Sequence, residues 1–420
     1  MVFANDFYGN SDIDILEAAI AARGADGTVV ICAKNDGSPW LLDRAVLLPE
    51  NITVILRNCK LKLSDRCRDN FFRTANCGLG IEDVKPTKNI RILGEGSVVL
   101  EGADHPRAAG DGSKYLVNPC PYLRGDFVTA ESLSLAHWVP EERKSADKLT
   151  VEDRHGHSFG TDAGKEGESQ KGDWRGIGIL LANVENFVID NITIKDSHGW
   201  GISVEGGSFG RISRIHFDDK MYKMIDGIAN NMENQDGIDL RNGCHDILIT
   251  DITGRTGDDV VALTAIAQDN GYRGGGLCTT HVMQHDWTER DRGIYNITIR
   301  NITATSCCCY LLRLLSVNSK IRNIVADGIV DTSLERDHWG AVLLGEPDHA
   351  YGVNPEDGIN GVILSNVISN GHGAAVRILG GVANTVINNV INKNPDSECV
   401  EVREGVSLRQ VTVTNAITVV

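Results

Sequence analysis

A repeated pattern of apolar residues most constrains what this chain can fold into. From Ile90 onward, a unit recurs in which apolar and polar residues alternate, an Asn or Asp interrupts, and a second alternating run follows. Units of this form occupy residues 186–197, 246–257, 295–306, 362–371 and 385–394. Units of roughly 20 to 30 residues are too small to bury their own apolar faces, so neighbouring units must stack. The repeats therefore predict a solenoid.

Short apolar strands lie between these units, and no helical spacing separates them. The second strands begin at Gly201, Gly237, Val260, Leu311, Ala341 and Ala375. A period of two indicates strands, and the lack of intervening helices argues against alternating strand and helix units. We therefore predict an all-β parallel β-helix, as one domain over residues 1–420, with Val, Ile and Leu filling the core.

Asparagines recur at one point of the repeat. Asn191, Asn301, Asn366 and Asn389 each follow the first alternating run of their unit. Such side chains satisfy backbone groups in turns and can hydrogen bond to one another. We interpret this stack as scaffold and not as part of a site.

Two kinds of segment depart from the repeat. Residues 11–24 have a helix-like spacing, with Ser11 placed to cap the helix and Gly24 to end it, which predicts an N-terminal cap. Residues 103–175, 208–233 and 266–293 are rich in charge, Gly and aromatic side chains. We expect these to be loop insertions on or near a cleft, with family-specific decoration or an oligomer contact as the alternative.

Charge and hydropathy limit the partners. A net charge of -16 argues against nucleic acid or an anionic membrane, because either would require a basic face. No segment approaches the roughly 20 apolar residues that span a membrane, and the first residues lack the regions of a signal peptide. We expect a cytoplasmic protein if the chain is complete, or a secreted or periplasmic one if a leader was removed. The oligomeric state is open.

The eleven cysteines are odd in number and include the adjacent run 307–309. Neighbouring cysteines cannot form disulfides without strain, and no C-x-x-C pair suggests zinc. We interpret the cysteines as small buried residues in a reducing compartment, and we expect neither a metal nor a cofactor.

Three aspartates stand at equivalent points of two successive repeats. Asp236 lies in one, and the pair Asp258 and Asp259 lies in the next. One coil per repeat would stack these carboxylates on one face, where they could perform acid and base chemistry. The alternative is structural, because Asp and Gly are common in turns.

Two segments resemble elements of glycoside hydrolase family 28, the polygalacturonase family of right-handed parallel β-helices. Residues 234–239 resemble its Asn-x-Asp-Gly-x-Asp element, and residues 257–263 resemble its Asp-Asp element. Residues 196–204 resemble the rung that comes before these elements in the family. The resemblance implies hydrolysis with inversion, in which Asp258 is the general acid and Asp236 and Asp259 hold the water. Inverting pairs are typically about 6.5 to 9.5 Å apart. Crowded carboxylates should raise the pKa of at least one member. Further substrate contacts are expected at Asn234, Asp239, His198 and Trp200.

The sequence also departs from that family. Counting rungs, the Gly-His-Gly motif of that family should fall near 309–311 and its Arg-Ile-Lys motif near 342–344, and neither motif is present there. A Gly-His-Gly sequence does occur at 371–373, but it lies two rungs too late, and we interpret it as a turn. We expect Tyr310 to take the place of the histidine. Alternation should point Arg313 and Arg377 into the cleft, where each either binds a sugar carboxylate or pairs with an aspartate.

These features together predict an exo-acting, inverting glycoside hydrolase with an oligosaccharide or polysaccharide as its partner. The missing cationic motif favours a neutral or branched pectin-related substrate over polygalacturonate. Two alternatives stay open: a β-helix lyase or epimerase, and a solenoid that binds carbohydrate without catalysis.

Overall fold

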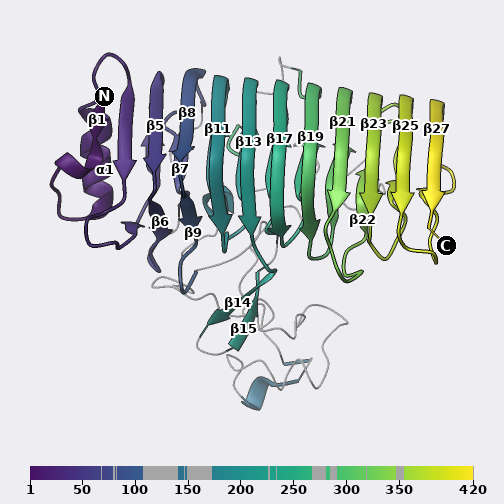
Figure 1. Cartoon of the computed structure of the whole chain (residues 1–420), viewed down its shortest axis with the longest axis horizontal. Coiled ribbons are helices and arrows are strands. Elements are labelled where there is room, and N and C mark those ends of the chain that lie inside the picture. Colours follow the sequence, from purple (N-terminus) through teal and green to yellow (C-terminus); the bar gives the residue numbers. More distant parts are fainter. Residues whose placement is uncertain are drawn as a thin grey trace.

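Parallel strands stacked along the longest axis dominate the molecule (Figure 1). The computed structural model describes residues 1–67, 69–78, 81, 83–106, 141–145, 147–148, 173–225, 228–232, 234–266, 281–283, 291–317, 319–346 and 354–419. Within these residues the strands form two long parallel sheets. The predicted parallel β-helix is confirmed.

The larger sheet contains 15 of the described strands. Its main path runs through β1 (Val2–Phe3), β2 (Thr28–Cys32), β5 (Ile52–Arg57), β8 (Thr87–Glu95), β11 (Val184–Lys195), β13 (Ser208–Asp218), β17 (His245–Thr256), β19 (Ile294–Ser306), β21 (Ile321–Asp331), β23 (Ile359–Ser369), β25 (Val382–Asn392) and β27 (Leu408–Thr418). Shorter strands at its edge are β3 (Trp40–Leu42), β6 (Lys60–Leu63) and β9 (Val99–Glu101).

The second sheet carries the short strands that the sequence predicted between the repeats. In order it contains β4 (Val46–Leu48), β7 (Phe72–Thr74), β10 (Ile179–Ala182), β12 (Ile202–Glu205), β16 (Ile238–Arg241), β18 (Val261–Ile266), β20 (Tyr310–Val317), β22 (Gly340–Leu344), β24 (Val376–Ile378) and β26 (Val400–Val402). A separate antiparallel hairpin joins β14 (Tyr222–Ile225) to β15 (Ile228–Asn231). The helical segments are α1 (Asp12–Ala21), η1 (Ala4–Asp6), η3 (Glu141–Arg143) and η4 (Asp173–Gly176).

Register places the same kind of residue above itself from rung to rung. Ile189 pairs with Ile212, which pairs with Ile249, which pairs with Ile299. All four are fully buried. Because side chains alternate across a strand, one apolar residue in two is enough to fill the interior of the coil. Stacked β-branched residues of this kind form the core along the whole axis.

The predicted asparagine stack is present and serves the bend in each long strand. Asn301, Asn366 and Asn389 adopt left-handed backbone conformations, with φ of 55°, 59° and 54°. Asn301 donates to Asp251 (3.0 Å), Asn366 to Asp327 (2.6 Å), and Asn389 to Asn366 (3.1 Å). Asn tolerates this conformation better than most residues, and its amide links one rung to the next.

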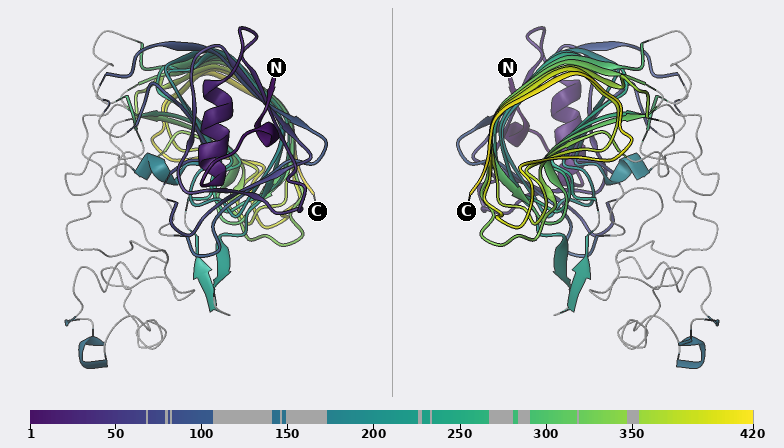
Figure 2. Two further views of the ribbon diagram at one scale, coloured as in Figure 1. Left: turned by 90° about the vertical axis from the view of Figure 1, so that its left-hand side faces the viewer. Right: turned by 90° about the vertical axis from the view of Figure 1, so that its right-hand side faces the viewer.

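The predicted cap helix is α1, which lies at the N-terminal end of the coil (Figure 2). Ser11 caps it by accepting from the Asp14 amide at 3.3 Å. Ile13 and Leu16 are fully buried against the first rungs. The helix ends at Ala21, three residues before Gly24.

The expected insertion over 208–233 is wrong for its first half, because 208–218 form the regular strand β13. The repeat was hard to recognise here because Phe209 and Arg214, not asparagines, hold the left-handed positions, with φ of 53° and 54°. Gly210 also replaces an inward apolar residue: a Cβ there would lie 2.1 Å from the ring of Phe187. The large ring on the neighbouring rung fills the space.

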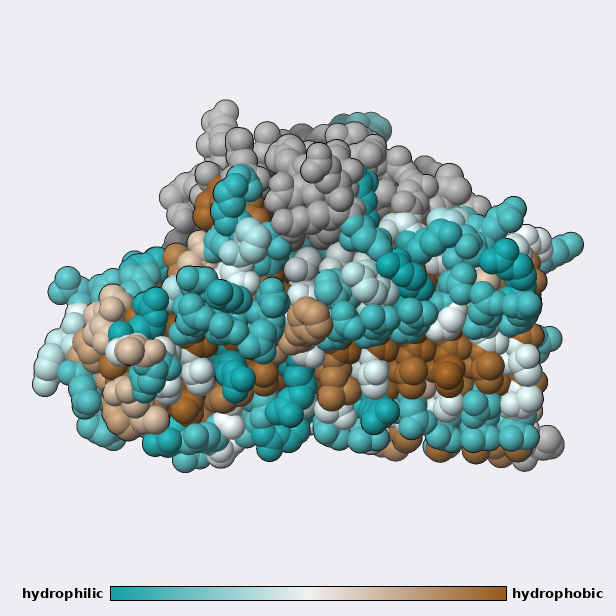
Figure 3. All heavy atoms as spheres, turned by 90° about the horizontal axis from the view of Figure 1, so that it is seen from above, coloured by the Kyte–Doolittle hydropathy of each residue, from teal (hydrophilic) through white to brown (hydrophobic). Residues whose placement is uncertain are grey.

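The remainder of that segment includes the β14–β15 hairpin, which projects away from the two sheets (Figures 1 and 2). The other two expected insertions, 103–175 and 266–293, lie largely outside the described residues. No helix in the described part of the chain is long and apolar enough to cross a membrane. Seen from above, a row of apolar residues runs between hydrophilic bands over the later rungs (Figure 3).

Candidate active site

The three predicted aspartates meet at the entry to two neighbouring strands. Asp236 precedes β16, and Asp258 and Asp259 precede β18. The amide of Gly237 donates to the Asp259 carbonyl at 2.8 Å, so the two turns lie one rung apart. One carboxylate oxygen from each of the three aspartates lies within 4.8 Å of the others. The predicted cluster is therefore assembled.

Gln235 holds both turns in place through hydrogen bonds, a role that was not predicted from the sequence. Its side chain is buried, donates to the Ser197 carbonyl at 2.8 Å and accepts from the Met221 amide at 2.8 Å. Its own carbonyl accepts from the amides of Gly257 (3.0 Å) and Asp258 (3.2 Å). The preceding Asn234 is partly exposed and left-handed, with φ of 55°.

Burial and mutual repulsion keep protons on this cluster. Burial, followed by the charges of neighbouring aspartates, holds the pKa of Asp236 well above its ordinary value. Burial likewise holds the pKa of Asp239 well above its ordinary value, and it raises the pKa of Asp259 to about 7. Oδ1 of Asp236 and Oδ2 of Asp239 are buried without a hydrogen-bond partner among the described residues. An acidic proton can therefore persist here near neutral pH.

Arg313 bridges the cluster to a further carboxylate. Its Nη1 lies 3.2 Å from Oδ2 of Asp259, and its Nη2 lies 3.1 Å from Oε2 of Glu346. The cation opposes the rise in the pKa of Asp259. Of the two roles left open for Arg313, ion pairing with an aspartate is the one observed.

Arg377 is also paired, although not with an aspartate. It forms two contacts with the Glu401 carboxylate, at 2.8 and 3.1 Å, and donates to the Tyr310 hydroxyl at 3.1 Å. Tyr310 is mostly buried, and its amide donates to Oδ1 of Asp259 at 2.9 Å. Burial raises the pKa of Tyr310 to about 12. Tyr310 thus contacts Asp259 through its amide and connects the cluster to Arg377 through its hydroxyl.

His198 and Trp200, where substrate contacts were predicted, are both buried. Nε2 of His198 accepts from the Ala103 amide at 2.9 Å, and burial lowers the pKa of this histidine to about 3. Trp200 packs in a small apolar cluster, with the guanidinium of Arg241 4.5 Å from its ring centre. Both side chains support the rung beside the aspartates.

Behind Asp239, buried polar side chains contact one another in a row that the sequence did not predict. Nη2 of Arg241 lies 2.5 Å from Nε2 of His281, whose Nδ1 lies 2.9 Å from Oε1 of Glu205. All three side chains are almost completely buried. The positive charge of Arg241 opposes the rise in the pKa of Asp239. Only Glu205 and Arg241 lie at strand ends, and nothing in the pattern links them to His281.

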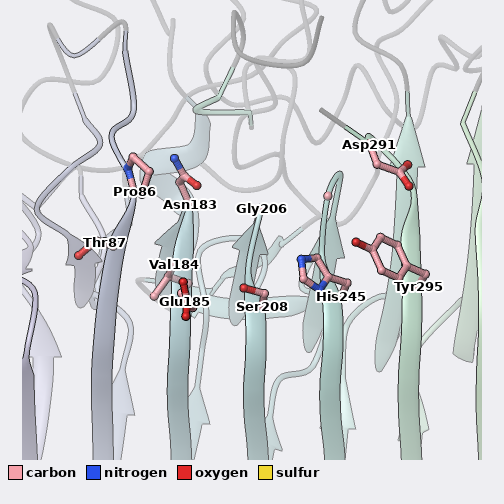
Figure 4. Close-up of a pocket in the computed structure, with 11 residues that line it drawn as sticks. Pro86, Thr87, Asn183, Val184, Glu185, Gly206, Ser208, His245, Asp291 and Tyr295 are labelled. Atoms are coloured by element: carbon pink, nitrogen blue, oxygen red, sulfur yellow. The ribbon is translucent and has the colours of Figure 1, made fainter. Parts of the chain in front are cut away.

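A separate hollow lies at the N-terminal ends of β11, β13, β17 and β19 (Figure 4). His245 and Tyr295 stack within it, with ring centres 4.8 Å apart, and Glu185 and Asp291 add carboxylates. None of the clustered aspartates lines this hollow. The chemistry of the aspartates, and not the presence of this hollow, identifies the candidate site.

Two parallel sheets wound into one coil define the chain as a parallel β-helix protein. No protein-family model matches it, and no curated protein matches its sequence. Solved structures do match. The surface adhesin PfbA of Streptococcus pneumoniae matches with a TM-score of 0.50 and 12% identity, over 99% of this chain and 92% of that chain. An N-terminal fragment of gene product 12 of bacteriophage phi29 matches with a TM-score of 0.51 and 13% identity, over 99% of this chain and 62% of that chain.

Polygalacturonases are also among the matching structures, one of them a family 28 exopolygalacturonase from Yersinia enterocolitica. An exopolygalacturonase from Thermotoga maritima matches with a TM-score of 0.49 and 14% identity, over 99% of this chain and 91% of that chain. At such low identities the likeness concerns the fold, which hosts several functions. Function must be argued from the site.

Proposed function

We propose that this chain is a glycoside hydrolase that uses Asp236, Asp258 and Asp259. One observation carries the proposal: carboxylates from two adjacent rungs bring their oxygens within 4.8 Å of one another. Glycoside hydrolysis needs a protonated carboxyl and an ionised one beside the same bond. Burial of Asp236 and the cation beside Asp259 support both states within one cluster.

In the proposed mechanism, Asp258 protonates the leaving glycosidic oxygen. Asp258 is partly exposed, whereas Asp236 and Asp259 are buried, so it is the member that a substrate meets first. Asp259, paired with Arg313, is the base that takes a proton from water, and Asp236 helps to hold that water. Inversion at the anomeric carbon follows if the water attacks directly.

The spacing of the carboxylates supplies a reason to test the stereochemistry. Carboxylate oxygens of the proposed acid Asp258 and the proposed base Asp259 lie within 4.8 Å of each other. This is shorter than the roughly 6.5 to 9.5 Å of typical inverting pairs and closer to the spacing of retaining pairs. Inversion is proposed from the motif, and a retaining mechanism is the second candidate.

A neutral or branched pectin-related oligosaccharide is the proposed substrate. Arg313 is engaged by Asp259 and Glu346, and Arg377 is engaged by Glu401. Binding a uronate carboxylate would require breaking one of these pairs, and leaving a charge unpaired is costly when it is partly buried. The neutral hydroxyl groups of a sugar can instead hydrogen bond to these arginines and carboxylates while the ion pairs stay intact.

Exo-action is proposed as well, on the sequence-based expectation about the long segments before the catalytic rungs, which lie largely outside the described residues. A time course of products decides this, because random cleavage in the middle of the chain would contradict it. A lyase or epimerase would need a base such as Tyr310, whose pKa of about 12 makes it a weak candidate at neutral pH.

The first experiment is product release from a panel of neutral and pectic oligosaccharides by the wild type and by Asp258→Asn. We expect release by the wild type and a loss of at least about 100-fold in kcat for the variant, because general acid catalysis contributes roughly 10²–10⁴-fold. Proton NMR of the first-formed anomer distinguishes inversion from retention. Undiminished release by the variant would remove Asp258 from the acid role, and an unsaturated product would indicate a lyase.

A further inference from the structure

Two adjacent thiols lie on the aspartate cluster. Cys308 and Cys309 belong to the turn before β20, one rung after the turn that carries Asp258. Their sulfur atoms are 3.4 Å apart, and both lie within 4.8 Å of a carboxylate oxygen of Asp258. All three side chains are partly exposed, so an ion from solvent can reach them. Treating these cysteines as inert apolar residues does not account for this placement.

A buried serine holds the three groups in fixed relation. Oγ of Ser306 accepts from the amides of Cys308 (3.2 Å) and Cys309 (2.9 Å) and donates to the carbonyl of Asp258 (2.8 Å). Ser306 is fully buried. Thr256 donates to the same Asp258 carbonyl at 2.6 Å. The backbone that carries both thiols and the carboxylate is therefore ordered before any ligand arrives.

The donor set matches one class of ligand. Thiolate sulfur together with a carboxylate oxygen favours zinc-like cations over magnesium or calcium. Zinc–sulfur bonds of about 2.3 Å in a tetrahedral site place two sulfurs roughly 3.8 Å apart, close to the separation here. Asp236, only 5% exposed and with an unpartnered Oδ1, lies beside Asp258 and can supply a fourth donor.

We propose that Cys308, Cys309 and Asp258 form a binding site for a thiophilic divalent cation of the zinc class. On binding, each thiol releases one proton to solvent and the two thiolates and the carboxylate coordinate the ion. The bound ion occupies the carboxyl that the proposed hydrolase uses as its acid, so it acts as an inhibitor. Only this inhibition rests on the proposed function; the binding site does not.

The test is a titration of the full chain with Cd²⁺, a zinc analogue whose bonds to thiolate absorb in the ultraviolet. We compare the wild type with Cys308→Ser/Cys309→Ser. The wild type should show an additional charge-transfer band that saturates at one equivalent, and the double variant should lack it. Equal bands in the two proteins would overturn the proposal.

Cys307→Ser is the matched control. Cys307 is adjacent to the pair, but its sulfur is turned toward Arg255, whose Nε lies 3.0 Å away. This variant should keep the band and the wild-type affinity. Asp258→Asn keeps both thiols and should weaken Cd²⁺ binding by about tenfold or more, since it removes a charged ligand. Unchanged affinity in Asp258→Asn would exclude the carboxylate from the site.

Inhibition is measured separately. With an active substrate from the panel, Zn²⁺ should inhibit the wild type and Cys307→Ser at concentrations that leave the double variant active. Inhibition of all three proteins alike would refute the inhibitory role. If no substrate is cleaved, the proposed hydrolase fails while the Cd²⁺ titration still decides the binding site.

Discussion

Arg313 is the residue whose charge most directly sets the state of the proposed base. Its guanidinium lies against Asp259 and opposes the burial that raises the pKa of this carboxyl to about 7. In Arg313→Gln the cation is lost, so the pKa of Asp259 should rise. Because a base must be ionised to act, the acidic limb of the kcat/KM profile should move to higher pH, by about one unit or more.

Arg377→Gln is the control for this shift. Arg377 is also paired with a carboxylate, but that carboxylate is Glu401 and lies outside the aspartate cluster. The acidic limb should stay in place in this variant even if the affinity for substrate falls. An unmoved limb in Arg313→Gln would show that Asp259 is not the base that limits the rate.

At the scale of one strand, each asparagine of the stack stabilises the bend that it occupies, and its contribution to the free energy of unfolding can be measured. Asn366 has a φ of 59°, donates to Asp327 and accepts from Asn389. Asn366→Ala loses both hydrogen bonds and strains the backbone, for a destabilisation of about 2–4 kcal/mol. Asn366→Gly keeps the conformation accessible, so it should lose roughly 1 kcal/mol less despite its smaller side chain. Urea unfolding measures both.

A native residue shows that glycine fits this column. Gly328 stands at the equivalent position one rung after Asn301, with φ of 76°. If Asn366→Ala and Asn366→Gly were equally destabilised, the left-handed backbone would contribute nothing and the side-chain ladder alone would account for the asparagines.

For the molecule as a whole, buried carboxyls make stability depend on pH. Asp219 is fully buried, and burial raises its pKa to about 7 even though Ser197 donates to both of its oxygens. Its folded pKa exceeds its unfolded pKa of 3.8, so its contribution to stability is complete below about pH 4 and is lost as the pH rises toward 7.

Asp219→Asn removes this dependence with little change of shape. Relative to the wild type, it should have equal stability near pH 4 and higher stability at pH 8, by at most about 4 kcal/mol, since one pKa unit is worth roughly 1.4 kcal/mol. Thermal unfolding at several pH values measures the difference. Asp218→Asn, at the partly exposed neighbour, should follow the wild-type curve. A constant difference across pH would contradict a raised pKa for Asp219.

The fold was predictable from the sequence because it depends on local periodicity. Alternation of apolar residues predicted the strands, recurrence of the unit predicted their stacking, and Ser11 marked the start of α1. The aspartates could be placed together because Asp236 and Asp259 occupy the same phase of successive coils, so the rung spacing alone makes them neighbours. The strand at 208–218 was not predicted because Phe209 and Arg214 replace the asparagines, and Gly210 replaces the inward apolar residue, that identify the repeat in other rungs.

Only the tertiary structure decided which contacts form between side chains that do not occupy equivalent positions of successive coils. The pairing of Arg313 with Glu346, the burial of His198, and the proximity of Cys308 to Asp258 depend on where turns and loops carry side chains after each strand ends. Such contacts join residues far apart in the chain and follow from the three-dimensional path of irregular segments. The sequence alone determined the coil and its line of aspartates, because a period repeats locally. The charges, burial and neighbours of those aspartates required the folded molecule, because they arise from packing between rungs.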